Sequence, residues 1–155
     1  MIKAQAKGCC SSAYDLFSGD EQVASFEHGW WREGATLSVG GESYRIEAAS
    51  RWGRGPFRLL LGDEVILEAT VPSIWKSHLV VDIGGDVLDL RPKSFTLKTW
   101  FLTDSAGTTR GRIERESWWS RRAVVDMPDG TPLSVQAFLL CLVVFMWNRQ
   151  MAAAS

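Results

Sequence analysis

The chain has 155 residues, 46% of them apolar and 23% charged, which is typical of a globular domain large enough to bury its own core. Its formal net charge of −1 gives no general attraction to nucleic acid, so we expect no nucleic-acid partner. Three cysteines, of which Cys9 and Cys10 are adjacent, do not make a disulfide framework and favour a reducing, cytoplasmic location.

Residues 1–12 are small and polar, and we expect them to be a flexible N-terminus. They contain no apolar stretch of the kind that forms a signal peptide. Residues 13–155 show no linker, low-complexity segment or fixed repeat. We therefore expect them to form a single domain.

Short stretches of alternating apolar and polar residues follow one another along most of this domain. The pattern predicts strands over residues 14–17, 21–27, 35–39, 42–49, 57–61, 64–71, 79–83, 86–90, 95–102, 108–115 and 123–127. Gly40-Gly41 and Gly84-Gly85 are typical two-residue hairpin turns. About eleven short strands with turns between them indicate an all-β barrel or sandwich.

The last part of the chain predicts a helix over residues 132–151. Thr131 is expected to be its N-cap and Pro132 its first residue. From Ala137 to Trp147 no side chain on any face is polar, so the helix must be enclosed by protein or by lipid. A membrane span needs about 20 mostly apolar residues, and this run is shorter, which favours a buried helix over a tail anchor.

An open sandwich has no place for a helix that is apolar on every face, whereas the interior of a closed barrel can hold one. The predicted fold is therefore mainly β: a closed antiparallel barrel of about 12 strands that encloses the C-terminal helix.

The serial hairpins from Tyr44 to Met127, the segment Gly111-Arg112-Ile113-Glu114-Arg115 and the apolar helix after Asp129-Gly130 resemble the tubby C-terminal-like superfamily. That superfamily includes the LURP-one-related proteins and the phospholipid scramblases. The resemblance implies a barrel threaded by a C-terminal hydrophobic helix. Because some members bind phosphoinositides, it also implies a binding function, and it brings no catalytic motif. The Cys-rich and calcium-binding segments of scramblases have no clear match here.

One stretch of the chain is locally basic. It contains Arg110, Arg112, Arg115, Arg121 and Arg122. Arginine suits phosphate because its planar guanidinium can donate two parallel hydrogen bonds. Arg110 and Arg112 would share one strand face and Arg115 the other, so a turn must help to bring the five together. The alternative interpretation is a solvated strand face.

A second candidate is a glycine-rich loop in which Arg51 and Arg54 flank Trp52. The backbone amides of such a loop can form an anion-binding nest. The alternative is a turn that needs glycine for its dihedral angles, with Trp52 covering the core.

No catalytic set, metal site or cofactor motif stands out. His28 and His78 are the two histidines and make a weak metal case, and we expect neither a metal nor a cofactor. The carboxylates Asp82, Asp86 and Asp89 are expected to surround a solvated hairpin tip. Cys141 is expected to be a core residue. A non-enzymatic protein is therefore favoured over an enzyme.

We expect a binding or interaction module that recognises anionic phospholipid headgroups or other phosphate ligands through its arginines. Such a protein would be cytoplasmic and peripheral to a membrane. The alternative is a membrane-attached, scramblase-like or tail-anchored protein whose C-terminal helix lies in lipid.

Overall fold

The computed structural model describes residues 1–7, 13–29, 34–48, 56–72, 78–93, 98–116 and 121–154. In these ranges the chain forms twelve strands and then one helix, α1 (Leu133–Ala154). The strands are β1 (Ile2–Ala6), β2 (Ala13–Ser18), β3 (Glu21–Gly29), β4 (Gly34–Val39), β5 (Glu42–Ala48), β6 (Phe57–Leu61), β7 (Glu64–Thr70), β8 (Leu79–Ile83), β9 (Asp86–Pro92), β10 (Thr99–Thr103), β11 (Thr109–Arg115) and β12 (Arg122–Asp126).

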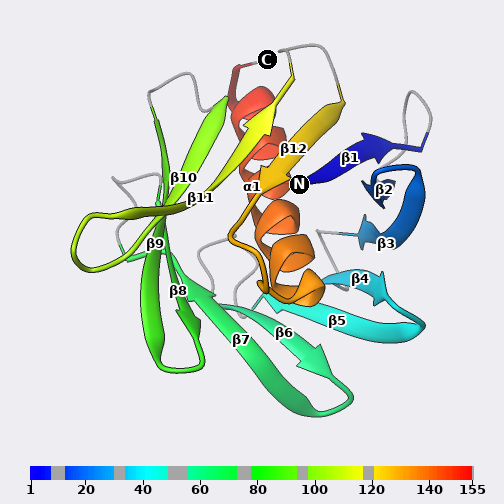
Figure 1. Cartoon of the computed structure of the whole chain (residues 1–155), viewed down its shortest axis with the longest axis horizontal. Helices are drawn as coiled ribbons and strands as arrows, with labels where there is room; N and C mark the ends of the chain where they lie inside the picture. Colours follow the sequence, from blue (N-terminus) through cyan, green and yellow to red (C-terminus); the bar gives the residue numbers. More distant parts are fainter. Residues whose placement is uncertain are drawn as a thin grey trace.

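The strands form one closed barrel in which each pairs antiparallel with its neighbours in the chain, and β1 closes the cylinder against β12. Figure 1 shows α1 running through the middle of this barrel. The prediction of a closed antiparallel barrel around a C-terminal helix is confirmed.

Glycine pairs make the tight turns possible. Gly40 and Gly41, between β4 and β5, have φ angles of 56° and 85°, in the left-handed region that residues with a Cβ rarely adopt. Positive φ at both central residues gives a turn whose twist matches that of the flanking strands. The hairpins are therefore encoded locally, and the chain needs no long crossover to build its sheet.

The N-terminal residues depart from the prediction of a flexible segment. Ile2 pairs with Val125 and Ala4 with Ala123, and the side chains of Ile2 and Ala4 are only 7% and 2% exposed. The prediction of a flexible segment was wrong for residues 2–6. Apolar residues alternate with polar ones there, but alanine is so small that the period-two pattern is weak, although the barrel still buries these side chains. Residues 8–12 lie outside the described residues, and the barrel domain includes β1 rather than beginning at residue 13.

A charge placed at Ala4 tests whether β1 closes the barrel. We expect Ala4→Asp to lower the free energy of unfolding by about 3 kcal/mol or more, because the new carboxylate is buried without a partner. Gln5→Asp, at the neighbouring exposed position, should stay within about 0.5 kcal/mol of the wild type. Thermal melting followed by circular dichroism measures both, and equal melting of the two variants would mean that β1 is not part of the folded wall.

The helix is covered on every side by the barrel. Each residue from Ala137 to Val144 has an exposed fraction of 0%, and Trp147 is 2% exposed. The inner wall consists of buried apolar side chains, among them Leu16, Phe26, Leu37, Ile46, Leu59, Leu79, Leu90, Trp100 and Ile113. Phe57 of β6 meets Phe145 of α1 edge to face, with ring centroids 5.5 Å apart. Cys141 is buried as predicted, and burial raises the pKa of its thiol.

The start of α1 differs in detail from the prediction. The Thr131 hydroxyl donates to the Pro128 carbonyl at 2.7 Å instead of accepting a hydrogen bond from the helix. The Pro132 carbonyl accepts from the N–H groups of Val135 and Gln136, both at 3.1 Å, so Pro132 occupies the N-cap position and the helix begins at Leu133. The Gln136 amide donates to the Thr131 carbonyl at 2.9 Å, which gives this polar side chain a partner at the mouth of the barrel.

Candidate functional site

The alternating direction of the strands gives the barrel two different ends. At the first, the turn end, tight turns join β2 to β3, β4 to β5, β6 to β7, β8 to β9 and β10 to β11, and α1 begins. At the second, the loop end, α1 ends and the remaining connections between strands leave and re-enter the wall. In Figure 1 the loop end is at the top, where the C-terminus is marked.

A cluster of positive side chains occupies the loop end, at or next to the ends of β1, β9, β10, β11 and β12. We call it the basic rim. It consists of Lys7, Lys93, Lys98, Arg115, Arg121 and Arg122. At the equivalent positions of the described residues the only carboxylate is that of Glu116. Asp15, two residues further along β2, pairs with Lys7 at 3.3 Å, so the six positive charges exceed these two negative ones by four.

Backbone hydrogen bonds hold these residues side by side across neighbouring strands. The N–H of Arg115 donates to the Lys98 carbonyl at 3.0 Å, and that of Lys93 donates to the Thr99 carbonyl at 2.7 Å. On the other side of β11, the Glu116 N–H donates to the Arg122 carbonyl at 3.0 Å. The Ala6 N–H donates to the Arg121 carbonyl at 3.1 Å. The basic rim is thus one continuous arc of the wall.

Two of the arginines lie over aromatic rings. The Arg115 guanidinium is 5.1 Å from the centroid of the Trp147 ring, and the Arg121 guanidinium is 5.8 Å from that of Tyr14. Such cation–π contacts hold a guanidinium in place without neutralising its charge. Arg115 is only 6% exposed, so its main role is to position the end of α1 and to add to the local positive field.

The two arginines also act on each other electrostatically. Burial lowers the pKa of the Arg115 guanidinium, and the positive charge of Arg121 lowers it further, while Tyr14 opposes the shift. Arginine keeps its proton in proteins, so the lowered pKa records mainly the cost of burying the Arg115 charge, with a smaller contribution from Arg121.

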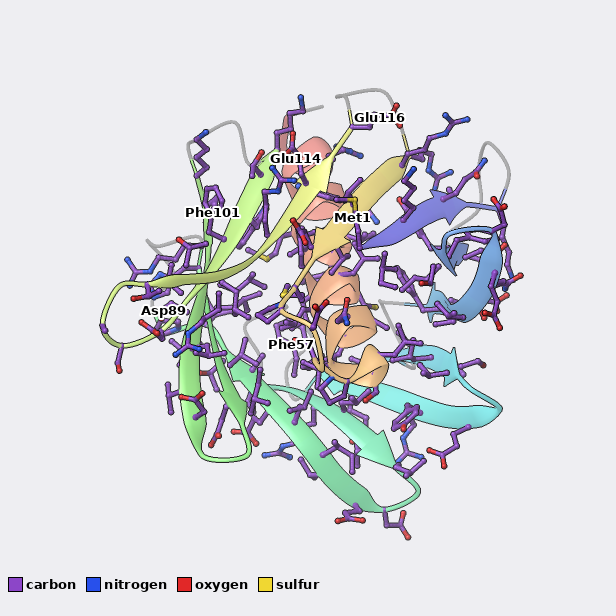
Figure 2. All side chains as sticks on the ribbon, in the orientation of Figure 1. Met1, Phe57, Asp89, Phe101, Glu114 and Glu116 are labelled. Atoms are coloured by element: carbon purple, nitrogen blue, oxygen red, sulfur yellow. The ribbon has the colours of Figure 1, made fainter. Side chains whose placement is uncertain are left out.

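Arg110 and Arg112 lie away from the basic rim. Arg110 is near the turn end and donates to the Asp104 carboxylate at 2.8 Å. This contact, with backbone donors of Thr108 and Ala106, holds the pKa of the Asp104 carboxyl below its usual range. Arg112 lies midway along β11 on the outer wall, 3.5 Å from Glu114, whose position Figure 2 labels.

The structure therefore brings together three of the five predicted arginines, namely Arg115, Arg121 and Arg122. Arg51 and Arg54 lie outside the described residues. The connection that contains them leaves β5 after Ala48 and returns to β6 at Phe57, both at the loop end.

Three lysines of the basic rim were missed in the sequence analysis. Lys7 is 3.3 Å from Asp15, whereas Lys93 and Lys98 make no ion pair within the part of the chain that the structure describes. A signal for them does exist, because every second connection of an up-and-down barrel lies at the same end. Lys93 and Lys98 flank one such connection, and Arg115 and Arg121 flank the next.

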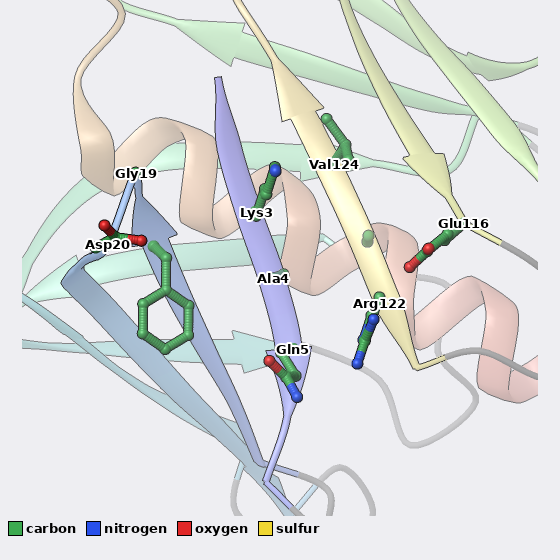
Figure 3. A pocket seen from close by; sticks show the side chains of 10 residues that line it. Lys3, Ala4, Gln5, Gly19, Asp20, Glu116, Arg122 and Val124 are labelled. Carbon is green, nitrogen blue, oxygen red and sulfur yellow. The ribbon is translucent and has the colours of Figure 1, made fainter.

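A hollow of about 680 Å³ lies on the outer wall beside the basic rim, over β1 and β12 (Figure 3). Lys3 and Arg122 contribute positive charge to it, and Asp20 and Glu116 contribute negative charge. In Figure 3 the Glu116 side chain extends toward Arg122. Because its charges balance, this hollow alone does not select an anion, and the basic rim is the stronger candidate.

A scan against protein-family models, a search of curated proteins and a search of solved structures found no match to this chain. Membership of the tubby C-terminal-like superfamily therefore stays a prediction. Among the described residues there is no helix long and apolar enough to cross a bilayer. The same residues contain no group of three His, Cys, Asp or Glu side chains arranged to hold a metal ion.

Proposed function

We propose that this protein is a non-enzymatic binding module whose basic rim holds the phosphate groups of anionic phospholipid headgroups. The observation that carries the proposal is the excess of four positive charges at the loop end in a chain whose net charge is −1. At the ends of β9 to β12, Lys93 and Arg122 are exposed and Lys98 and Arg121 half-buried, so their N–H donors reach the surface on neighbouring strands. Phosphate oxygens match such donors, and guanidinium groups can bind them in pairs.

The distribution of tryptophan supports a lipid surface as the source of the phosphate. Six of the eight tryptophans belong in sequence to connections that start and finish at the loop end. They are Trp30, Trp31, Trp52, Trp75, Trp118 and Trp119, and their placement lies outside the described residues. Tryptophan is enriched at the level of lipid headgroups, where one side of its ring is apolar and its N–H meets water.

The predicted resemblance to the tubby C-terminal-like superfamily points in the same direction, because some of its members bind phosphoinositides. A protein of this kind would be cytoplasmic and would associate with a membrane from outside. In this proposal the helix stays inside the barrel, and the contact with lipid is electrostatic and reversible.

Vesicle flotation tests the proposal. We expect the protein to float with phosphatidylcholine vesicles that contain a phosphoinositide, and much less with phosphatidylcholine alone. Each basic residue near an anionic surface contributes about 1 kcal/mol, so the double change Lys93→Glu and Lys98→Glu should weaken binding about 30-fold or more. Raising the salt concentration should also weaken the binding of the wild-type protein to anionic vesicles.

The matched control moves the same charge change to the outer wall. Lys3→Glu with Arg45→Glu alters net charge equally but leaves the basic rim intact, and it should bind nearly as the wild type does. Equal binding to neutral and anionic vesicles would contradict the proposal and favour the alternative in which α1 enters lipid. Soluble inositol phosphates that bind as tightly as vesicles would assign the rim to a free phosphate ligand instead.

A further inference from the structure

The turn end has the opposite charge to the loop end. At or just beyond the strand ends there, the described residues include nine carboxylates, and Arg110, the second residue of β11, lies among them in a hollow that Asp86 and Asp129 also line. We call this set of carboxylates the acidic turns. It consists of Asp20, Glu21, Glu42, Asp63, Glu64, Asp86, Asp104, Asp126 and Asp129. All except Asp104 are exposed, and Arg110 pairs only with Asp104 among them.

The two ends are too far apart to neutralise each other. The 22 residues of α1 span about 33 Å at 1.5 Å per residue, and α1 runs from one end to the other (Figure 1). Electrostatic screening acts over about 10 Å at 0.1 M salt, so each end presents its own charge to its surroundings. The net charge of −1 therefore conceals a strongly dipolar molecule.

Part of this arrangement stabilises the fold. The first turn of α1 contains no acidic residue, so this turn carries no charge that matches the positive end of the helix dipole. Asp86 and Asp129 line a hollow with Thr131 and Pro132 at this end, where carboxylates are favourable. The exposed carboxylates of the acidic turns and the exposed Lys93 of the basic rim face solvent, where a second molecule can meet them.

We propose that a second copy of this chain docks its basic rim onto the acidic turns of the first. Charge complementarity supports this occupant, because each copy carries both halves of the contact. Val65 and Val87, which are 49% and 52% exposed beside Glu64 and Asp86, add apolar surface to the acidic side. The contact joins different surfaces of the two copies, so it leaves one free end of each kind and extends into head-to-tail chains.

This contact uses the basic rim but does not depend on the proposed lipid ligand. An anionic surface would compete with the second copy for the same side chains. Variants at the acidic turns test self-association without touching the basic rim, so the two ideas can fail separately.

Sedimentation velocity tests the contact. At an ionic strength of about 0.01 M, where screening extends to about 30 Å, we expect the mean mass to rise with protein concentration beyond twice the 17.3 kDa monomer. At about 1 M, where screening shortens to about 3 Å, the protein should be a monomer. A wild-type protein that stays monomeric at low salt, or that associates equally at both ionic strengths, would overturn the proposal.

Two variants block one end each. The turn variant carries Asp63→Asn, Glu64→Gln and Asp86→Asn on adjacent hairpins, and the rim variant carries Lys93→Gln, Lys98→Gln and Arg122→Gln, so that neither changed end gains a charge that could attract the other. Each alone should be monomeric at low salt with a wild-type circular dichroism spectrum. Mixed together, they should form a complex that stops at one copy of each, because the intact rim of one meets the intact turns of the other.

The mixture also separates this contact from other modes of association. A turn variant that still associates as the wild type does would show that the copies meet elsewhere. A mixture in which both folded variants remain monomeric would also contradict the proposal. If the turn variant is monomeric yet floats with anionic vesicles, the self-association proposal stands together with the lipid proposal.

Discussion

Val144→Asp is expected to unfold the protein. Val144 lies in the middle of α1 with an exposed fraction of 0%, and apolar side chains of the barrel surround the helix. A carboxylate there must either remain charged without a partner or take up a proton, and both cost several kcal/mol. Because a domain of this size is stable by only about 5–15 kcal/mol, we expect loss of the folded state or a very large fall in melting temperature. Leu140→Asp should behave in the same way.

The chain offers a matched control for this change. Val87→Asp is the same chemical replacement at a position that is 52% exposed. It should lower the free energy of unfolding by only about 1 kcal/mol, because the new carboxylate lies opposite Asp82 on β8. Circular dichroism melting curves of the two variants provide the comparison. A Val144→Asp protein that melts like the Val87→Asp protein would show that the helix is not enclosed in solution.

Deleting residues 132–155 is expected to leave a barrel that cannot fold. The deletion removes eight consecutive helix residues, Ala137 to Val144, whose exposed fractions are all 0%. Burying one large aliphatic or aromatic side chain contributes about 1.5–3 kcal/mol, so the lost contacts exceed the stability of a typical domain. The inner wall would then be exposed and would associate with other copies. Size-exclusion chromatography should show aggregates, and no cooperative melting transition should be seen.

A shorter truncation serves as the control. Removing residues 149–155 keeps the buried positions up to Trp147, and this protein should remain soluble and melt cooperatively. The two truncations also distinguish a helix enclosed by the barrel from a helix that lies in lipid. If the helix belonged in lipid, the barrel without it would be a stable, monomeric protein, and that result would contradict the enclosed helix.

Strands, turns and helix follow from short-range pattern, which explains why the fold class could be predicted. Alternation such as Leu67 and Ala69, which are buried on either side of Glu68, marks a strand wherever it lies in the chain. Gly40-Gly41 marks a turn for reasons of backbone geometry alone. The predictions for β1 and for the start of α1 were wrong because the local sequence signals there were weak. The alanines of β1 have little hydrophobic contrast, and the hydroxyl of Thr131 found a closer partner in the Pro128 carbonyl than in the helix.

The arginine site could be predicted only in part, because five arginines close in sequence are not close in space. The strand β11 carries Arg110 to one end of the barrel and Arg115 to the other. Lys7 lies far in sequence from Lys93 and Lys98, yet backbone hydrogen bonds place all three on the same arc as Arg121. The local sequence shows neither the separation of Arg110 from Arg115 nor the grouping of the lysines with Arg121.

The amino-acid sequence by itself determined that the chain is a series of hairpins and that its last helix must be enclosed, since period and polarity are properties of neighbouring residues. Only the tertiary structure decided which charges share an end of the barrel. That grouping depends on how the strands alternate in direction and on the closure of the wall by β1, which joins the two termini of the sheet.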